Sequence, residues 1–430
     1  MTTLDRPSAG PLLDVARVRE LFDLRNAYSA FIGGTYTDDP YAVWNALRDK
    51  APVQAGTLHE LSGVTDPLIF HGLPETEKPH FTAFTYEACD AAYRNPEVFA
   101  SSADAIGADF DAAPDIQNSM PSMGGTRHRR YRALVQPSFL PAKAEWWMRN
   151  WIEETVHALI DHFAAQGRAE LNVDFCAAIP VLTITGSFGV PVEKALDVRA
   201  AMRNPDDVID IIKPIVAARR EQPRDDLISI LVEAEITDED GTKHRLSDPE
   251  IYSFALLLLA AGSGTTWKQM GIVLTTLLQR PDVLSAVVTD RSLLRPAIEE
   301  TLRWEPTDPM FSRWVTRDVE HFGVHLPKGS VLHLALGAGN RDPSRWDRPD
   351  EWDHTRAPKA SLAFGGGPHI CLGMHVARAE MQTGINALLD RLPNLRVDPD
   401  AEPPRLIGFY ERGATAIPVR FGSGMRRARR

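Results

Sequence analysis

The residues best suited to chemistry lie at positions 364–373, where the sequence reads FGGGPHICLG. Gly365 to Gly367 allow a tight backbone turn, and a run with helical spacing follows Cys371. A thiol at the start of a helix meets unpaired backbone N–H groups, which favour the thiolate. Thiolate sulfur is a soft ligand that suits iron, so we expect Cys371 to bind iron. A buried structural role suits Cys89 and Cys176 better, because neither follows a glycine turn.

Composition limits the kind of protein that surrounds this cysteine. The 430 residues carry 47 Lys+Arg and 58 Asp+Glu, a net charge of −11, which argues against a nucleic-acid partner. Three widely spaced cysteines give no disulfide framework and indicate a reducing compartment. The N-terminus lacks a signal-peptide pattern, and the most apolar run, FALLLLAAG, is too short to cross a bilayer. We therefore expect a soluble, cytoplasmic protein without a membrane span.

Helical spacing dominates the chain, and strand-like segments gather near its two ends. No repeat or low-complexity linker divides it, so we expect a single domain over 1–430. Pro327-Lys328-Gly329 predicts a hairpin turn, and RLIGFYERGATAIPVRF predicts a final hairpin. The expected β-rich parts are 50–86, 311–337 and 405–421, the helical core 87–304 and 372–391, and a disordered basic tail 422–430.

One long helix is predicted from a capping box at Ser247–Glu250 to Arg280, where Pro281 ends it. At 1.5 Å per residue this helix is about 50 Å long. Its middle, FALLLLAAGSGTT, is apolar on all sides and should cross the core. Gly262 and Gly264 lie inside it, and each costs up to about 1 kcal/mol relative to alanine. Close approach of a ligand would explain them.

The pattern Phe-Gly-x-Gly-x-His-x-Cys-x-Gly, from Phe364 to Gly373, resembles the haem-binding loop of the cytochrome P-450 superfamily. The pattern is long and specific, and further family landmarks follow in order over most of the chain. The resemblance implies the cytochrome P-450 fold, mainly α with a smaller β part. It also implies haem b (iron protoporphyrin IX) between the long helix and the helix after Cys371. Cys371 would then be the metal ligand, Phe364 would shield its sulfur, and His369 would meet a propionate.

The resemblance extends to the rest of the cofactor site and to one structural network. RHRRYRALVQPSF supplies His128 and Arg132 for the propionates, and FSRWVT supplies Arg313. The implied cofactor-binding residues are Cys371, His369, Phe364, Gly365, Gly373, His128, Arg132, Arg313 and Ala261. The Glu-x-x-Arg pair, Glu300 and Arg303, would form a structural network with Arg356; alone, such a pair would be a weak surface contact.

The segment from Ala261 to Thr266 resembles the family's oxygen-binding segment, with Thr265 and Thr266 as catalytic residues. The family usually has an acid before the threonine, and this chain has Gly264 there. Three consequences stay open: poorly coupled monooxygenation, reliance on a polar group of the substrate, or use of peroxide.

The family's substrate-lining positions are mostly apolar in this chain, which predicts a hydrophobic pocket. They are Ile106, Phe110, Leu257, Ala260, Pro309, Met310, Phe311 and Tyr410. The resemblance therefore implies a haem-thiolate monooxygenase that uses O₂ to hydroxylate or epoxidise a hydrophobic small molecule, with terpenoid or lipid-like substrates favoured.

A basic stretch suggests the electron donor. Arg127, Arg129 and Arg130 form a patch in an acidic protein, either a solvated helix face or a docking site for a ferredoxin or flavodoxin-like protein. One rival function is peroxide-driven oxidation or oxidative coupling of an aromatic or polyketide-type substrate, supported by Gly264. A second is a non-enzymatic haem-based ligand binder.

Overall fold

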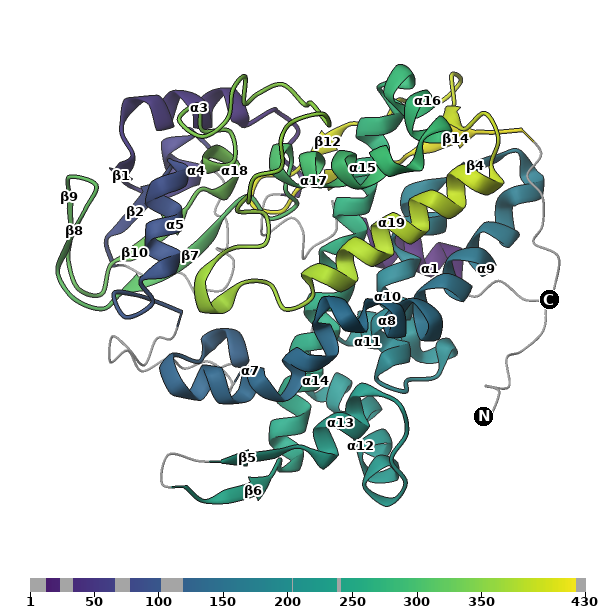
Figure 1. Cartoon of the computed structure of the whole chain (residues 1–430), viewed down its shortest axis with the longest axis horizontal. Coiled ribbons are helices and arrows are strands. Elements are labelled where there is room, and N and C mark those ends of the chain that lie inside the picture. Colours follow the sequence, from purple (N-terminus) through teal and green to yellow (C-terminus); the bar gives the residue numbers. More distant parts are fainter. Residues whose placement is uncertain are drawn as a thin grey trace.

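Helices make up most of the molecule (Figure 1), so the expected mainly α fold is confirmed. The computed structural model describes residues 13–23, 34–65, 78–101, 119–202, 204–237 and 241–422. The helices in the first half are α1 (Val15–Leu21), α3 (Tyr41–Lys50), α4 (Leu58–Leu61), α5 (Tyr86–Arg94), α7 (Gly125–Phe139), α8 (Ala144–Trp147), α9 (Glu153–Phe163), α10 (Ala178–Ser187), α11 (Ala195–Ala201) and α12 (Pro205–Glu221). The later helices are α13 (Leu227–Glu233), α14 (Asp248–Gly264), α15 (Thr266–Leu278), α16 (Pro281–Thr289), α17 (Leu294–Trp304), α18 (Leu336–Gly339) and α19 (Met374–Arg391).

The main sheet lies at one end of the molecule, on the left in Figure 1, with strand order β1-β2-β10-β7-β3. Its strands are β1 (Val53–Ala55), β2 (His80–Ala83), β3 (Phe99–Ala100), β7 (Phe311–Val315) and β10 (Val331–Leu334). Strands β2 and β10 are parallel, whereas the other pairs are antiparallel. Early and late segments of the chain therefore share one sheet, which fixes Arg313 opposite Leu332.

Smaller sheets account for the other strands. They are β4 (Arg168–Glu170) with β14 (Pro418–Arg420) and β11 (Arg396–Val397), β5 (Glu235–Thr237) with β6 (Lys243–Arg245), β8 (Val319–His321) with β9 (Val324–Leu326), and β12 (Leu406–Ile407) with β13 (Gly413–Ala414). The β12–β13 pair is the expected final hairpin.

The hairpin predicted at Pro327-Lys328-Gly329 is wrong. These residues do make a turn, in which the Ser330 N–H donates to the Pro327 carbonyl at 3.1 Å, but they join β9 to β10, which do not pair. The hairpin lies one step earlier, between β8 and β9. All four residues of β10 are buried, and β2 and β7 flank this strand on its two sides, so it has no free edge for β9.

The predicted single long helix is two helices, α14 and α15, separated at Thr265. Its start is as expected, because the Ser247 N–H and hydroxyl both donate to the Glu250 carboxylate, at 2.8 and 2.7 Å. The Ser263 hydroxyl donates to the Leu259 carbonyl at 2.8 Å, a contact that competes with the helix ladder and commonly bends helices. Together with the low helix propensity of Gly262 and Gly264, this contact explains the break.

Helix packing explains why residue 262 is a glycine, and the sequence did not reveal this contact. A Cβ at Gly262 would lie 2.7 Å from the Ile184 side chain, so glycine lets α14 pack closely on α10. A Cβ at Gly264 would meet nothing within 4 Å, so open space lies beside that residue. Of the two glycines, only Gly264 fits the expectation of room for a ligand.

Apolar side chains form one large core among the helices and two smaller cores against the main sheet. Within the described ranges, no single helix combines the length and apolarity needed to cross a membrane. Asp248–Leu278 and Pro281–Thr289 pass such a test only as a pair, and the pair is bent by 102°.

Candidate active site

The glycine loop before α19 is shaped by its contact with the end of α5. Gly365 and Gly367 have φ angles of +67° and +62°, a region that side chains rarely adopt. A Cβ at Gly367 would lie 2.0 Å from the Tyr93 carbonyl oxygen, so only glycine fits there. The Cys371 N–H donates to the Phe364 carbonyl at 2.9 Å and closes the loop. This geometry holds Cys371 three residues before the first residue of α19.

The Cys371 side chain is exposed, with protein groups close around it. Desolvation raises the pKa of its thiol, and the Gly373 N–H and the charges of Arg132 and Arg378 oppose this effect only in part. Burial and the N–H groups at the helix start therefore act on the pKa of the Cys371 thiol in opposite directions. A coordinated metal deprotonates a thiol outright, so ligation itself would create the thiolate here.

Basic side chains crowd the same region. The rings of His128, on α7, and His369 lie 3.9 Å apart between centroids, and Figure 1 shows α7 below the loop that enters α19. Burial and neighbouring cations lower the pKa of His128 to about 4 and that of His369 to about 3. Arg313 is buried in β7, and Arg132 is half-buried on α7. Within the described residues, none of these four groups forms an ion pair with a carboxylate.

This site fits a haem group. Arg132 and Arg313 are at least half-buried cations without a carboxylate partner among the described residues, which is costly, and the two propionates of haem would supply the missing negative charge. The neutral His128 and His369 rings can donate hydrogen bonds to the same groups. Ala260 and Ala261 are exposed in the middle of an otherwise largely buried helix, and the open space beside Gly264 continues that small apolar wall. Cys371 would hold the iron, while His128, Arg132, Arg313 and His369 would hold the propionates. When bound, haem supplies the oxygen chemistry, and the protein supplies orientation and charge.

The two candidate catalytic threonines differ in their surroundings. Thr265 lies at the break between α14 and α15, is half-buried, and makes no side-chain hydrogen bond within the part of the chain that is described. Its hydroxyl therefore does not bond its own helix, unlike that of Ser263. Thr266 is buried as the first residue of α15. Of the two hydroxyls, that of Thr265 is the more accessible.

A buried ion pair, missed in the sequence, lies close to this break. Lys268, in the first turn of α15, contacts Glu411 from the loop between β12 and β13, and their side chains are 1% and 4% exposed. Desolvation lowers the pKa of Lys268, and Glu411 opposes that change. A lysine three residues after Thr265 in an apolar run was the available signal, but its partner is 143 residues away along the chain.

The predicted substrate-lining residues do not all reach open space. Ala260 is exposed, and Leu257 and Phe311 are half-buried. Met310 and Tyr410 have no exposed surface and pack in one core cluster, where the Tyr410 hydroxyl bonds the His59 ring at 2.7 Å. Pro309 is also buried. These three predictions are corrected, since the residues fill the core behind β7; Ile106 and Phe110 lie outside the described residues.

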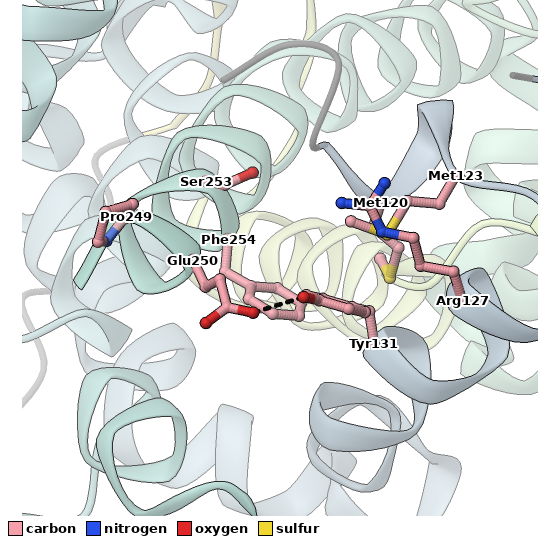
Figure 2. Close-up of a pocket in the computed structure, with 8 residues that line it drawn as sticks. All are labelled: Met120, Met123, Arg127, Tyr131, Pro249, Glu250, Ser253 and Phe254. Carbon is pink, nitrogen blue, oxygen red and sulfur yellow. Dashed lines mark hydrogen bonds between the residues drawn. The ribbon is translucent and has the colours of Figure 1, made fainter. Parts of the chain in front are cut away.

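A pocket of about 190 Å³ lies between α7 and the first turns of α14 (Figure 2). The Tyr131 hydroxyl donates to the Glu250 carboxylate at 2.5 Å across it, and the Tyr131 and Phe254 rings stack with centroids 5.8 Å apart. Phe254 precedes Ala261 by two helical turns on one face of α14. The pocket therefore lies on the face of α14 that leads to Ala261. Its lining residues are Met120, Met123, Arg127, Tyr131, Pro249, Glu250, Ser253 and Phe254.

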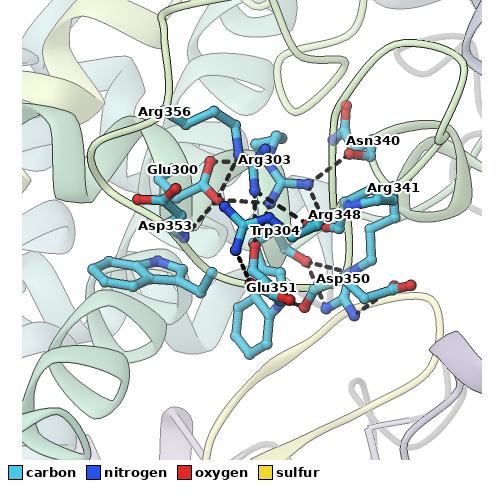
Figure 3. A network of polar contacts seen from close by, with 12 residues as sticks. Glu300, Arg303, Trp304, Asn340, Arg341, Arg348, Asp350, Glu351, Asp353 and Arg356 are labelled. Carbon is cyan, nitrogen blue, oxygen red and sulfur yellow. Dashed lines mark hydrogen bonds and ion pairs between the residues drawn. The ribbon is translucent and has the colours of Figure 1, made fainter.

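The structure also brings Glu300, Arg303 and Arg356 together (Figure 3). Arg303 makes a two-pronged contact with the Glu300 carboxylate at 2.7 and 2.8 Å, and Arg356 approaches it at 3.3 Å. Arg303 also donates to the carbonyls of Asn340 and Pro349. The network ties α17 to the segment leading to the Cys371 loop and does not take part in the site itself.

Comparison with known proteins agrees with this geometry. The family model described as Cytochrome P450 matches residues 191–409. Cytochrome P450 107B1 of Saccharopolyspora erythraea is 34% identical over 326 residues, 72% of this chain and 79% of the relative. The 6-deoxyerythronolide B hydroxylase of the same organism is 33% identical over 310 residues, 67% of this chain and 75% of the relative.

Solved structures give the same result. P450BioI, in complex with an acyl carrier protein ligated to hexadec-9Z-enoic acid, superposes with a TM-score of 0.76 at 27% identity. The match covers 89% of this chain and 99% of that one. The chain therefore belongs to the cytochrome P450 family, and it is a haem b monooxygenase of that family.

Proposed function

We propose that this monooxygenase hydroxylates or epoxidises a hydrophobic small molecule of terpenoid or lipid-like type. The observation that carries the proposal is the open, small, apolar face of α14 at Ala260 and Ala261. Leu257 continues this face, and no charged side chain of α14 interrupts it between Glu250 and Gly264. An apolar ligand would lose water on this wall without leaving a buried charge unpaired.

A polyketide-type substrate is the second candidate, and it is favoured by the relatives. A polyketide biosynthesis cytochrome P450, PksS of Bacillus subtilis, is 32% identical to this chain over 310 residues, and the other relative named above hydroxylates, by its name, 6-deoxyerythronolide B. Such substrates are bulkier than most terpenoids. The two classes therefore differ in how much of the Ala260–Ala261 wall they would cover.

Exposed arginines at the start of α7 favour a ferredoxin or flavodoxin-like electron donor. Arg127 and Arg129 are exposed, whereas His128 and Arg132 of the same helix turn toward the Cys371 loop. An acidic donor docked on α7 would therefore lie one helix away from the iron ligand. Charge complementarity of this kind raises the association rate and weakens with salt.

Proton supply is where this chain departs from its family. The Thr265 hydroxyl can hold a proton at Oγ, but Gly264 offers no carboxylate to replace it. We expect water admitted to the open space beside Gly264 to supply the protons instead. We expect loosely coupled turnover, with peroxide-driven oxidation as the competing reaction.

The first test is an optical titration of the ferric protein with terpenoids, fatty acids and a macrolactone. A low-to-high-spin shift with terpenoids or fatty acids supports the proposal, and a shift with the macrolactone alone supports the second candidate. Ala260→Phe should abolish the shift because its ring fills the open wall. Val288→Phe, which adds the same ring at an exposed position on α16, should leave the shift unchanged.

The second test compares donor-driven and peroxide-driven turnover in the natural protein and in Gly264→Asp. The variant returns a carboxylate beside Thr265, so we expect more product per electron and less peroxide released. If peroxide supports turnover as well as the donor does, and Gly264→Asp changes neither, oxidation by peroxide is the better description.

A further inference from the structure

A half-exposed ion pair lies beside the Cys371 loop and takes no part in the functions above. Arg378 on α19 donates to both carboxylate oxygens of Glu299 on α17, from Nε at 2.5 Å and from Nη2 at 2.9 Å. The two side chains are 28% and 40% exposed. The contact is two-pronged, so it fixes the plane of the guanidinium as well as its position.

This fixed guanidinium lies against the loop. The Cζ atom of Arg378 is 4.6 Å from the centre of the Phe364 ring, within the range of a cation–π contact. The carbonyl of the same Phe364 accepts the N–H of Cys371 at 2.9 Å. Glu299, Arg378, Phe364 and Cys371 thus form one continuous chain of contacts.

Arg378 also acts on the sulfur through its charge. The Arg378 guanidinium lies against Phe364, whose carbonyl accepts the Cys371 N–H, so its positive charge lies close to the loop that carries the sulfur. Arg132 has no carboxylate partner among the described residues, whereas Glu299 neutralises part of the charge of Arg378. The carboxylate of Glu299 therefore decides how much positive charge the sulfur meets from this side.

We propose that Glu299 is a positioning residue that sets the reduction potential of the iron held by Cys371. It holds Arg378 flat on Phe364 and limits the positive charge beside the sulfur. The inference rests on the haem site described above, and it concerns how readily the iron accepts the first electron. Reduction adds negative charge at the iron, so nearby positive charge favours it and nearby negative charge opposes it.

Two substitutions should move the potential in opposite directions. Glu299→Gln keeps the shape of the side chain and removes its negative charge, so the reduced iron should be stabilised and the reduction potential should rise. Arg378→Gln removes the positive charge, so the oxidised iron should be stabilised and the reduction potential should fall. We expect roughly a tenfold change in the ratio of reduced to oxidised iron in each case, which is about 59 mV for a one-electron couple. The double variant should return close to the natural value.

The experiment is a spectroelectrochemical titration of the ferric holoenzyme and its variants. Asp390→Asn is the matched control, because Asp390 lies on α19 and pairs with Arg291 just before α17, far from the loop. Glu299→Asp, which keeps the charge, should stay close to the natural potential. If Glu299→Gln and Arg378→Gln change only the thermal midpoint, as Asp390→Asn can, the pair is structural and the proposal is overturned.

A second measurement distinguishes failure of the proposal about Glu299 from failure of the haem assignment. The ferrous carbon monoxide complex of each variant should retain a thiolate-type spectrum. An unaltered thiolate spectrum with an unmoved potential refutes the role of Glu299 alone. Absence of that spectrum in the natural protein would instead refute Cys371 as the ligand, together with the inference built on it.

Discussion

Glu380 on α19 is a buried acid whose ionisation should make the stability of the protein depend on pH. Glu380 is 3% exposed, and no cation forms an ion pair with its carboxylate in the described part of the chain. Burial raises the pKa of this carboxyl from its ordinary value of 4.5 to about 8. Near neutral pH the folded protein therefore holds a proton on Glu380 that the unfolded chain releases.

The sign and the size of the effect follow from this difference. Between the two pKa values the folded state binds more protons than the unfolded state, so the free energy of unfolding falls as pH rises. Each unit of pKa difference corresponds to about 1.4 kcal/mol. From about pH 6 to about pH 8, the ionisation of Glu380 should therefore remove about 2 kcal/mol of stability.

Urea unfolding of the ferric protein at both pH values measures this loss. Glu380→Gln replaces the neutral acid with an amide of the same shape, so the variant should lose about 2 kcal/mol less than the natural protein over that interval. Glu193→Gln, at an exposed carboxyl outside the core, measures the effect of net charge. Equal losses in the natural protein and in Glu380→Gln would refute the reasoning, because Glu380 would then ionise as readily folded as unfolded.

Further predictions concern the iron ligand, the helix contact and the structural network. Cys371→Ser should abolish the thiolate-type spectrum of the ferrous carbon monoxide complex, and a retained spectrum would place the ligand elsewhere. Gly262→Ala should cost about 1–3 kcal/mol in thermal or urea unfolding, because its Cβ overlaps Ile184, whereas Gly264→Ala should cost nothing. Arg303→Met should lower the free energy of unfolding by about 3–5 kcal/mol, because the buried Glu300 carboxylate loses a partner. Arg405→Met, which breaks an exposed pair of the same spacing, should lower it by under about 1 kcal/mol. Similar losses for the two variants would contradict the buried network.

The site could be predicted where its signal is local. The glycine turn and Cys371 lie within ten residues, so residue types and their spacing predict a metal ligand on a tight loop. The same holds for the start of α14, because a capping box is a contact between residues three apart. His128 could be placed near His369 only through the family resemblance, since 241 residues separate them.

Other features depend on partners that are distant in the sequence. Glycine is needed at position 262 because of Ile184, which lies on a separate helix 78 residues earlier in the chain. Met310 and Tyr410 match the family's pocket positions, yet they fill a core with Tyr41 and Trp44. Whether an apolar side chain faces a ligand or a core depends on what packs against it, and periodicity alone does not report that.

The sequence by itself determined the family, the mainly helical fold and the glycine at position 264 where the family has an acid, because these follow from residue types and their spacing along the chain. It also predicts Cys371 as the iron ligand. Only the tertiary structure decided which cations gather around Cys371 without carboxylate partners and how Glu299 holds Arg378 against Phe364. It also decided that burial opposes the thiolate. These are properties of solvation and charge, which depend on every group that lies close in space, whatever its distance along the chain.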